Sequence, residues 1–115
     1  IYNQMTDTAD YYKDRVLNLL KFDSSELKPI TSKRIQRQFN MNDVEVRQTI
    51  RQLRLDCHPV GSGPKGFYYA RKGSELNASI ADLKSRVAAI VDVIKKLEDA
   101  KERLLDDDGQ RLLDL

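Results

Sequence analysis

Apolar residues recur at helical spacing along most of the chain and alternate with polar residues only within residues 57–70. The first periodic segment predicts an amphipathic helix that begins at Asp7 or Thr8 and continues to about Phe22. Its apolar face consists of Tyr12, Val16, Leu19 and Leu20. The pattern therefore predicts a mainly α-helical fold, in which this first helix supports the elements that follow.

Two short helices are predicted next, over residues 31–39 and 43–54, with a three-residue turn between them. Thr31 or Ser32 is the expected N-cap of the first. Asn40 stands where such a turn requires a positive φ, which Asn tolerates better than most residues. Two helices joined in this way are typical of a helix-turn-helix, whose second helix lies in the major groove of DNA.

The second of these helices separates apolar from basic side chains. Asn42 and Glu45 predict a capping box at its start. Its expected buried stripe consists of Val46, Ile50 and Leu53, joined by Cys57 if the helix runs that far. The neighbouring face, about 80° to 140° around the axis, carries Arg47, Arg51 and Arg54. Arginine can bridge phosphates or pair with guanine, and the nearby Gln48 can pair with adenine. A solvated basic face without a ligand is the alternative.

The segment GSGPKG, between Val60 and residues 67–69, predicts a β-hairpin, which would form the wing of a winged helix-turn-helix. Lys65 at its tip is a candidate phosphate contact. Tyr68 and Tyr69 alternate in direction, so one is expected in the core and the other exposed. A nucleotide-binding loop is excluded because the GxxxxGK[ST] spacing is absent. A hairpin without a ligand stays open as an alternative.

Residues 74–105 contain no Gly or Pro and carry a heptad pattern, which predicts one long coiled-coil helix after a start at Gly73 and Ser74. The candidate oligomerisation residues are Leu76, Ile80, Leu83, Val87, Ile90, Ile94, Leu97 and Leu104, with Lys101 as a polar residue in the same stripe. β-Branched residues at most a positions and Leu at most d positions favour a parallel two-stranded form. Val91 and Val93 widen the apolar face, so an antiparallel or four-helix assembly, or packing against the chain's own first helix, stays open.

The chain is accordingly divided into a DNA-binding domain over residues 1–73, an oligomerisation helix over 74–105 and an acidic flexible tail over 106–115. The net charge of +2 conceals an uneven distribution. Residues 30–74 carry nine basic and three acidic side chains, a local net charge of +6. Positive charge therefore gathers on the segment with the helix-turn-helix pattern, as expected of a nucleic-acid-binding module.

Cys57 and His58 are the only residues of their types, so neither an intrachain disulfide nor a structural zinc site is expected. Cys57 is interpreted as a small buried residue. Without a signal sequence or a long apolar run, a soluble cytoplasmic protein without cofactor or membrane association is predicted. The sequence also lacks a recognisable nucleophile–base set, so no enzymatic activity is expected.

Three short motifs resemble those of small winged-helix proteins from phages and prophages. They are Pro59-Val60-Gly61-Ser62, Gly66-Phe67-Tyr68-Tyr69 and Leu83-Lys84-Ser85-Arg86. The resemblance covers about residues 31–95 and implies DNA binding in phage or mobile-element gene control or replication, in a bacterial cytoplasm or nucleoid. Two positions depart from the family pattern: Gln36 replaces a small residue and Asn40 replaces the turn glycine.

The predicted function is sequence-specific binding of double-stranded DNA by a homodimer or higher homo-oligomer, acting on repeated sites as a transcriptional regulator. Alternatives are a replication-origin-binding factor and a protein–protein interaction module assembled through the coiled coil. The candidate DNA-binding residues are Lys33, Arg34, Arg37, Asn42, Arg47, Gln48, Arg51, Arg54 and Lys65.

Overall fold

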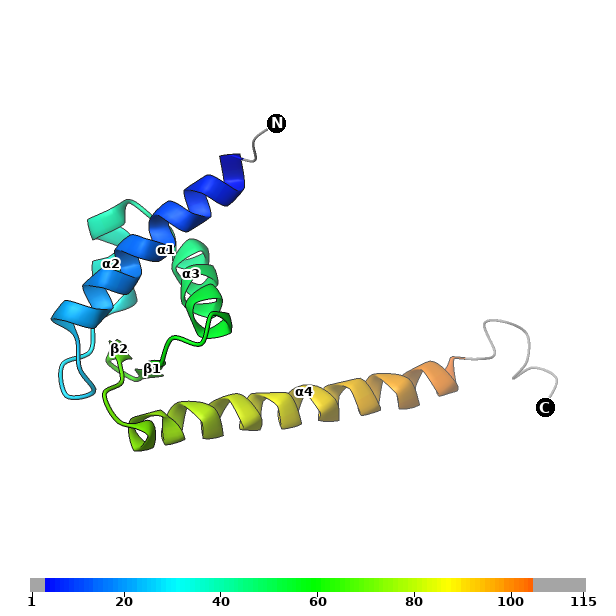
Figure 1. The fold of residues 1–115 in the computed structure, drawn as a ribbon. Helices are drawn as coiled ribbons and strands as arrows, with labels where there is room; N and C mark the ends of the chain where they lie inside the picture. Colours follow the sequence, from blue (N-terminus) through cyan, green and yellow to red (C-terminus); the bar gives the residue numbers. More distant parts are fainter. Residues whose placement is uncertain (1–3, 105–115) are drawn as a thin grey trace, which may run out of the picture. The chain divides into compact units, whose positions relative to one another are not determined.

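The computed structural model describes the backbone of residues 4–104 and the side chains of residues 11–104. The described residues form four α-helices, one short 3-10 helix and one β-hairpin (Figure 1). In chain order these are α1 Gln4–Asp23, α2 Ser32–Phe39, α3 Asp43–Leu55, β1 Val60–Gly63, β2 Gly66–Tyr69, η1 Gly73–Leu76 and α4 Asn77–Arg103. The expectation of a mainly α-helical chain with a hairpin and a long last helix is confirmed. The predicted tail, residues 106–115, lies outside the described residues.

Contacts divide the chain into two compact units, Ile1–Ser79 and Ile80–Leu115, which are described separately. The first unit extends beyond the expected limit at residue 73, because η1 and the first turn of α4 belong to it. Leu76, expected as part of the coiled-coil stripe, accordingly lies in η1 and is half-buried in the first unit.

The core of the first unit is made by apolar side chains from α1, α2, α3 and the start of the hairpin. It consists of Val16, Leu19, Leu20, Ile30, Ile35, Met41, Val46, Ile50, Leu53 and Val60. The predicted apolar faces of α1 and α3 both contribute, and α1 and α2 each contact α3. Burial of one such side chain stabilises the fold by about 1.5–3 kcal/mol, so α3 is fixed in rotation by its buried stripe.

The turn between α2 and α3 follows the sequence prediction closely. Thr31 is the N-cap of α2, and its Oγ1 accepts a hydrogen bond from the Arg34 N–H at 3.1 Å. Asn40 adopts the left-handed conformation with a φ of 54°. Asn42 and Glu45 form the capping box, because each side chain accepts a hydrogen bond from the other residue's backbone N–H. These local interactions set where α3 begins.

β1 and β2 pair antiparallel, with Val60 opposite Tyr69 and Gly63 opposite Gly66. An additional bridge joins β2 to the loop before α2: the Ile30 N–H donates to the Phe67 carbonyl at 2.7 Å, and the Phe67 N–H donates to the Ile30 carbonyl at 2.8 Å. Both strands of the described residues lie within residues 57–70, where the sequence predicted a strand pattern, and the isolated bridge at Ile30 lies outside that range. A single bridging residue has no periodicity by which it could be recognised.

Two further expectations are corrected. α1 begins at Gln4, so Asp7 and Thr8 lie within the helix and neither is its N-cap. Cys57 is exposed and adopts a φ of 70°, outside α3, which ends at Leu55. The Cys57 N–H donates to the Arg54 carbonyl at 2.9 Å, and this turn takes the thiol out of line with the buried stripe.

Tyr68 and Tyr69 differ in burial, but neither is exposed, whereas their alternation predicted that one of them would be. Tyr68 is buried, and its hydroxyl donates to the Glu75 carbonyl at 2.6 Å, which ties β2 to η1. Tyr69 is half-buried and packs against the core. Both tyrosines therefore serve the fold of the first unit.

Candidate nucleic-acid interface

α3 presents one buried and one exposed side. The buried side carries the predicted stripe of Val46, Ile50 and Leu53, each 2% exposed or less. The opposite side is exposed and carries Val44, Arg47, Gln48, Arg51 and Leu55. Their spacing of three and four residues places them on one continuous face, which we call the α3 face. Two arginines and one glutamine lie together on this exposed face.

Within the α3 face, the two arginines differ in their partners. The Arg47 Nε lies 3.1 Å from an Asp43 carboxylate oxygen one turn earlier, and both side chains are more than half exposed. Such a surface pair is worth about 0.3–0.5 kcal/mol, too little to hold Arg47 against a phosphate or a base. Neither the Arg51 side chain nor the Gln48 side chain has a hydrogen-bonding or ionic partner among the described residues.

Asp43 also connects the two helices of the motif. Its Oδ1 accepts a hydrogen bond from the Ser32 hydroxyl at 3.1 Å, and the Gln36 amide donates to the same hydroxyl at 3.0 Å. Gln36, which departs from the small residue of the phage family pattern, therefore contributes to this connection. The start of α3 is thus fixed to α2 beside the α3 face.

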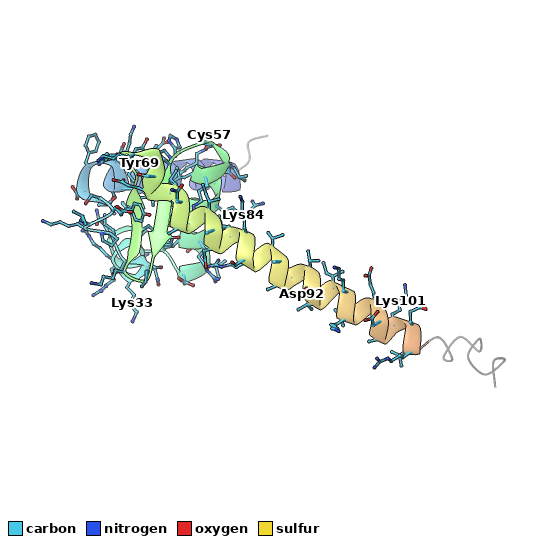
Figure 2. All side chains as sticks on the ribbon, turned by 90° about the horizontal axis from the view of Figure 1, so that it is seen from below. Lys33, Cys57, Tyr69, Lys84, Asp92 and Lys101 are labelled. Carbon is cyan, nitrogen blue, oxygen red and sulfur yellow. The ribbon has the colours of Figure 1, made fainter. Side chains whose placement is uncertain are left out.

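The basic residues of α2 are all exposed, as predicted, but they are not equivalent. Arg34 lies 3.4 Å from the Asp23 carboxylate at the end of α1. Arg37 donates from its Nε to the Lys33 carbonyl at 3.5 Å. Lys33 itself points away from the core of the first unit (Figure 2) and has no side-chain partner among the described residues. Lys33 is therefore the most available of these cations.

Lys65 stands at the turn of the hairpin, between Pro64 and Gly66, and is exposed. Both strands are anchored close to this turn, β2 at Phe67 by Ile30 and β1 at Ser62 by Ser79. Lys65 therefore extends from a fixed support, although its own flexible side chain makes no interaction with the described residues.

Two other predicted DNA-binding residues, Arg54 and Asn42, make side-chain hydrogen bonds that hold the elements of the interface in place. The Arg54 Nε donates to the Val60 carbonyl at 2.8 Å, and its Nη2 donates to the Ser62 hydroxyl at 3.1 Å. The half-buried Arg54 thus connects the end of α3 to β1. The Asn42 side chain accepts the capping hydrogen bond from the Glu45 N–H at 2.8 Å. Both residues position the interface rather than offer free donors to a ligand.

Three residues that sequence reasoning missed hold the hairpin in place. Ser79 makes two hydrogen bonds with Ser62. The Ser24 hydroxyl accepts from the Tyr69 N–H at 2.9 Å and donates to the Leu20 carbonyl at 2.6 Å. The Arg71 guanidinium lies 5.1 Å from the Tyr69 ring centre and donates to the Ser24 carbonyl at 3.3 Å. No local pattern marks these residues, because their partners are distant in sequence.

One ion pair fixes α1 to the end of α3. The Lys13 ammonium lies 2.9 Å from the Asp56 carboxylate. This hydrogen-bonded contact lowers the pKa of Asp56 below its ordinary value, with a smaller contribution from the Gln52 amide. The pair thus supports the side of α3 that lies opposite the α3 face.

The second unit consists of α4 from Ile80 onward, and every one of its described side chains is exposed. Lys84, Asp92 and Lys101 mark its length in Figure 2. The exposed apolar side chains are Ile80, Leu83, Val87, Ile90, Val91, Val93, Ile94, Leu97 and Leu104. The predicted apolar heptad residues, except Leu76, therefore lie on a face that no described residue of this unit covers.

Within residues 4–104, no three His, Cys, Asp or Glu side chains come together in a way that could hold a metal ion. None of the described helices is both long enough and apolar enough to cross a membrane. Neither observation adds a second candidate site to the α3 face and its flanks.

No family model, curated protein or solved structure matches this chain. The resemblance to phage and prophage winged-helix proteins consequently stays a prediction from the sequence motifs.

Proposed function

We propose that the first unit is a winged helix-turn-helix that binds double-stranded DNA, with α3 in the major groove. The observation that carries this proposal is the α3 face, where Arg47, Gln48 and Arg51 are exposed on a helix whose opposite side is fixed in the core. Arg and Gln are the side chains that pair with the edges of guanine and adenine in the major groove.

The elements next to α3 supply the second part of the argument. Lys33 on α2 and Lys65 at the hairpin turn are exposed cations on the elements before and after α3. In winged helix-turn-helix proteins these elements contact the phosphate backbone and set the register of the recognition helix. We assign Arg47, Gln48 and Arg51 to base reading, and Lys33, Arg37 and Lys65 to phosphate contacts.

The proposal extends to self-association. An apolar face as long as that of α4 is unfavourable in water, and a second copy of the same helix would cover it. A dimer would present two α3 faces and would bind repeated sites more tightly than one unit alone. The proposed role is a regulator or origin-binding factor of phage or mobile-element type in the bacterial cytoplasm.

The test is a selection of DNA fragments by the purified full chain, from a random-sequence library at two salt concentrations. Enrichment of one repeated motif, with affinity falling as salt rises, is the expected result. The Arg15→Ala variant should select the same motif as the native chain. Arg15 is an exposed arginine on α1, and α1 packs on the buried side of α3, away from the α3 face. Recovery without any enriched motif would refute sequence-specific binding. Retention that is insensitive to salt would refute binding through phosphate contacts and favour a protein-interaction role.

A further inference from the structure

The heptad positions of α4 distinguish between two orientations of pairing with a second copy, which we call the parallel and the antiparallel order. With Ile80 at an a position, the other a residues are Val87, Ile94 and Lys101. The d residues are Leu83, Ile90, Leu97 and Leu104. The residue types at the a and d positions favour the parallel order, but they do not take account of the residues that border the core. We propose that α4 instead pairs with a second copy in the antiparallel order, centred on Asp92.

Lys101 is a charged residue at an a position and favours the antiparallel order. In a parallel, in-register pair, each a residue faces its own counterpart, so the two Lys101 ammonium groups would meet inside the apolar stripe. Like charges in contact are unfavourable, and the cost rises as they are removed from water. In the antiparallel order, an a residue faces a d residue, and Lys101 lies opposite Leu83 of the second copy. The two Lys101 residues then lie at opposite ends of the pair.

One antiparallel register gives every core position from Ile80 to Leu104 a partner. Ile80 lies opposite Leu104, Val87 opposite Leu97, and Ile90 opposite Ile94, in addition to Leu83 opposite Lys101. Shifting the register by one heptad in either direction leaves core residues without a partner. The four kinds of layer each occur twice, on either side of a twofold axis beside Asp92. All of these side chains from Ile80 to Leu104 are exposed on the single helix and therefore accessible.

The charged residues that border the stripe also favour the antiparallel order. In an antiparallel pair, e positions face e positions, which brings Lys84 opposite Glu98 of the second copy, twice per pair. At 1.5 Å per residue, these two positions differ by about 3 Å along the axis, within reach of an ion pair. In the parallel order, g faces e, so Arg86 would face Val91 and Glu98 would face Val93. Only the antiparallel order matches charges of opposite sign.

The antiparallel order also accounts for the widened apolar face of α4. Val91 and Val93 stand at an e and a g position, where polar residues are usual, and they are 39% and 58% exposed. In the antiparallel register each meets its own counterpart beside the twofold axis, so apolar surface covers apolar surface. Arg86 needs no partner from the second copy, because it lies 2.8 Å from Asp82 in its own helix. The small Ala100 faces it across the pair.

The antiparallel order has a consequence for the proposed DNA binding. The two Ile80 residues, where the first units are attached, would lie about 36 Å apart along the pair, whereas the parallel order would place them side by side. A dimer in the antiparallel order would therefore carry its two first units at opposite ends of the helix pair. This inference rests on the proposed self-association through α4, and its test distinguishes failure of self-association from failure of the antiparallel order.

The test uses the full chain with Cys57→Asn, which removes the native thiol and suits the positive φ at that position. One cysteine is then introduced as Val91→Cys or Ile80→Cys, and each variant is treated with a short bismaleimide. Cross-linking of Val91→Cys but not of Ile80→Cys is the expected result. Cross-linking of Ile80→Cys alone would overturn the antiparallel order and leave self-association standing. Sedimentation as a monomer at tens of micromolar would overturn both, and a tetramer would overturn the two-stranded pair.

A charge exchange provides a second readout. Lys84→Glu and Glu98→Lys should each weaken dimerisation on the order of tenfold, because each places like charges opposite one another twice. The double variant should recover the original dimerisation constant. Lys95→Glu is the matched control, because Lys95 occupies a b position away from the stripe and should leave dimerisation nearly unchanged. Absence of recovery in the double variant would contradict the pairing of Lys84 with Glu98.

Discussion

One hydroxyl group, that of Ser79, satisfies both backbone polar groups of Ser62. The Ser79 Oγ accepts a hydrogen bond from the Ser62 N–H at 2.9 Å and donates one to the Ser62 carbonyl at 3.1 Å. Ser79 is only 6% exposed, so water cannot easily replace it. The hydroxyl takes the place that a neighbouring strand would occupy along the outer edge of β1.

Ser79→Ala should therefore destabilise the first unit by about 1–3 kcal/mol, because the Ser62 N–H and carbonyl lose their partner while remaining partly covered. Chemical denaturation followed by circular dichroism would measure this loss. Ser85→Ala, at an exposed position of α4, is the matched control and should change the free energy of unfolding by less than about 0.5 kcal/mol. Equal effects of the two substitutions would show that the Ser79–Ser62 contact contributes little.

Two glycines of the hairpin should respond differently to alanine. Gly66 has a φ of 132°, and a Cβ atom there would overlap the Ile30 carbonyl group. Gly66→Ala should therefore cost at least about 1–3 kcal/mol and disrupt the bridge to Ile30. Gly63 has no atom within 4 Å of the corresponding position. Thermal unfolding of both variants would test this, and a Gly63→Ala variant as unstable as Gly66→Ala would contradict the explanation.

The ion pair of Asp56 with Lys13 should make the free energy of unfolding depend on pH in a specific way. Because the Lys13 contact lowers the pKa of Asp56 in the folded state below 3.8, the pair stabilises the fold above that pH. Its contribution should disappear as the pH falls from about 3.8 through the lower folded-state pKa. Asp56→Asn should thus be less stable than the native chain at pH 7, and the difference should shrink at pH 3. A difference that is the same at both pH values would rule out this ion pair as its source.

Lys65 should contribute to affinity without contributing to sequence preference. Lys65→Ala should weaken binding to all DNA sequences to a similar degree and reduce the slope of log affinity against log salt by about one. Fluorescence anisotropy over a series of salt concentrations would measure the slope. An unchanged slope would remove Lys65 from the set of phosphate contacts.

The parts of the fold that the sequence predicted are those determined by neighbouring residues. The capping box of Asn42 and Glu45 and the positive φ of Asn40 depend on a few adjacent positions, and both are confirmed. The buried stripe of α3 was also predictable from helical periodicity. Cys57 was misplaced because periodicity does not show where a helix ends.

Contacts between distant residues were beyond the reach of such patterns. The Ile30–Phe67 bridge joins two segments on either side of α2 and α3 and leaves no periodic trace. Arg54 shares a face with Arg47 and Arg51 by helical spacing, but only the packing of the hairpin directs it toward Val60. Within the candidate interface, the sequence therefore identified the helix and its face, while the structure separated exposed donors from residues engaged within the fold.

The most direct test of DNA recognition by the α3 face compares Arg51→Ala with Arg15→Ala on a DNA motif selected by the native chain. Binding to this motif and to a scrambled duplex of equal length would be measured at one salt concentration. We predict that Arg51→Ala loses about 1–3 kcal/mol on the motif and much less on the scrambled duplex, whereas Arg15→Ala retains the native preference. Equal losses on both duplexes, or a native preference in Arg51→Ala, would contradict base reading by this residue.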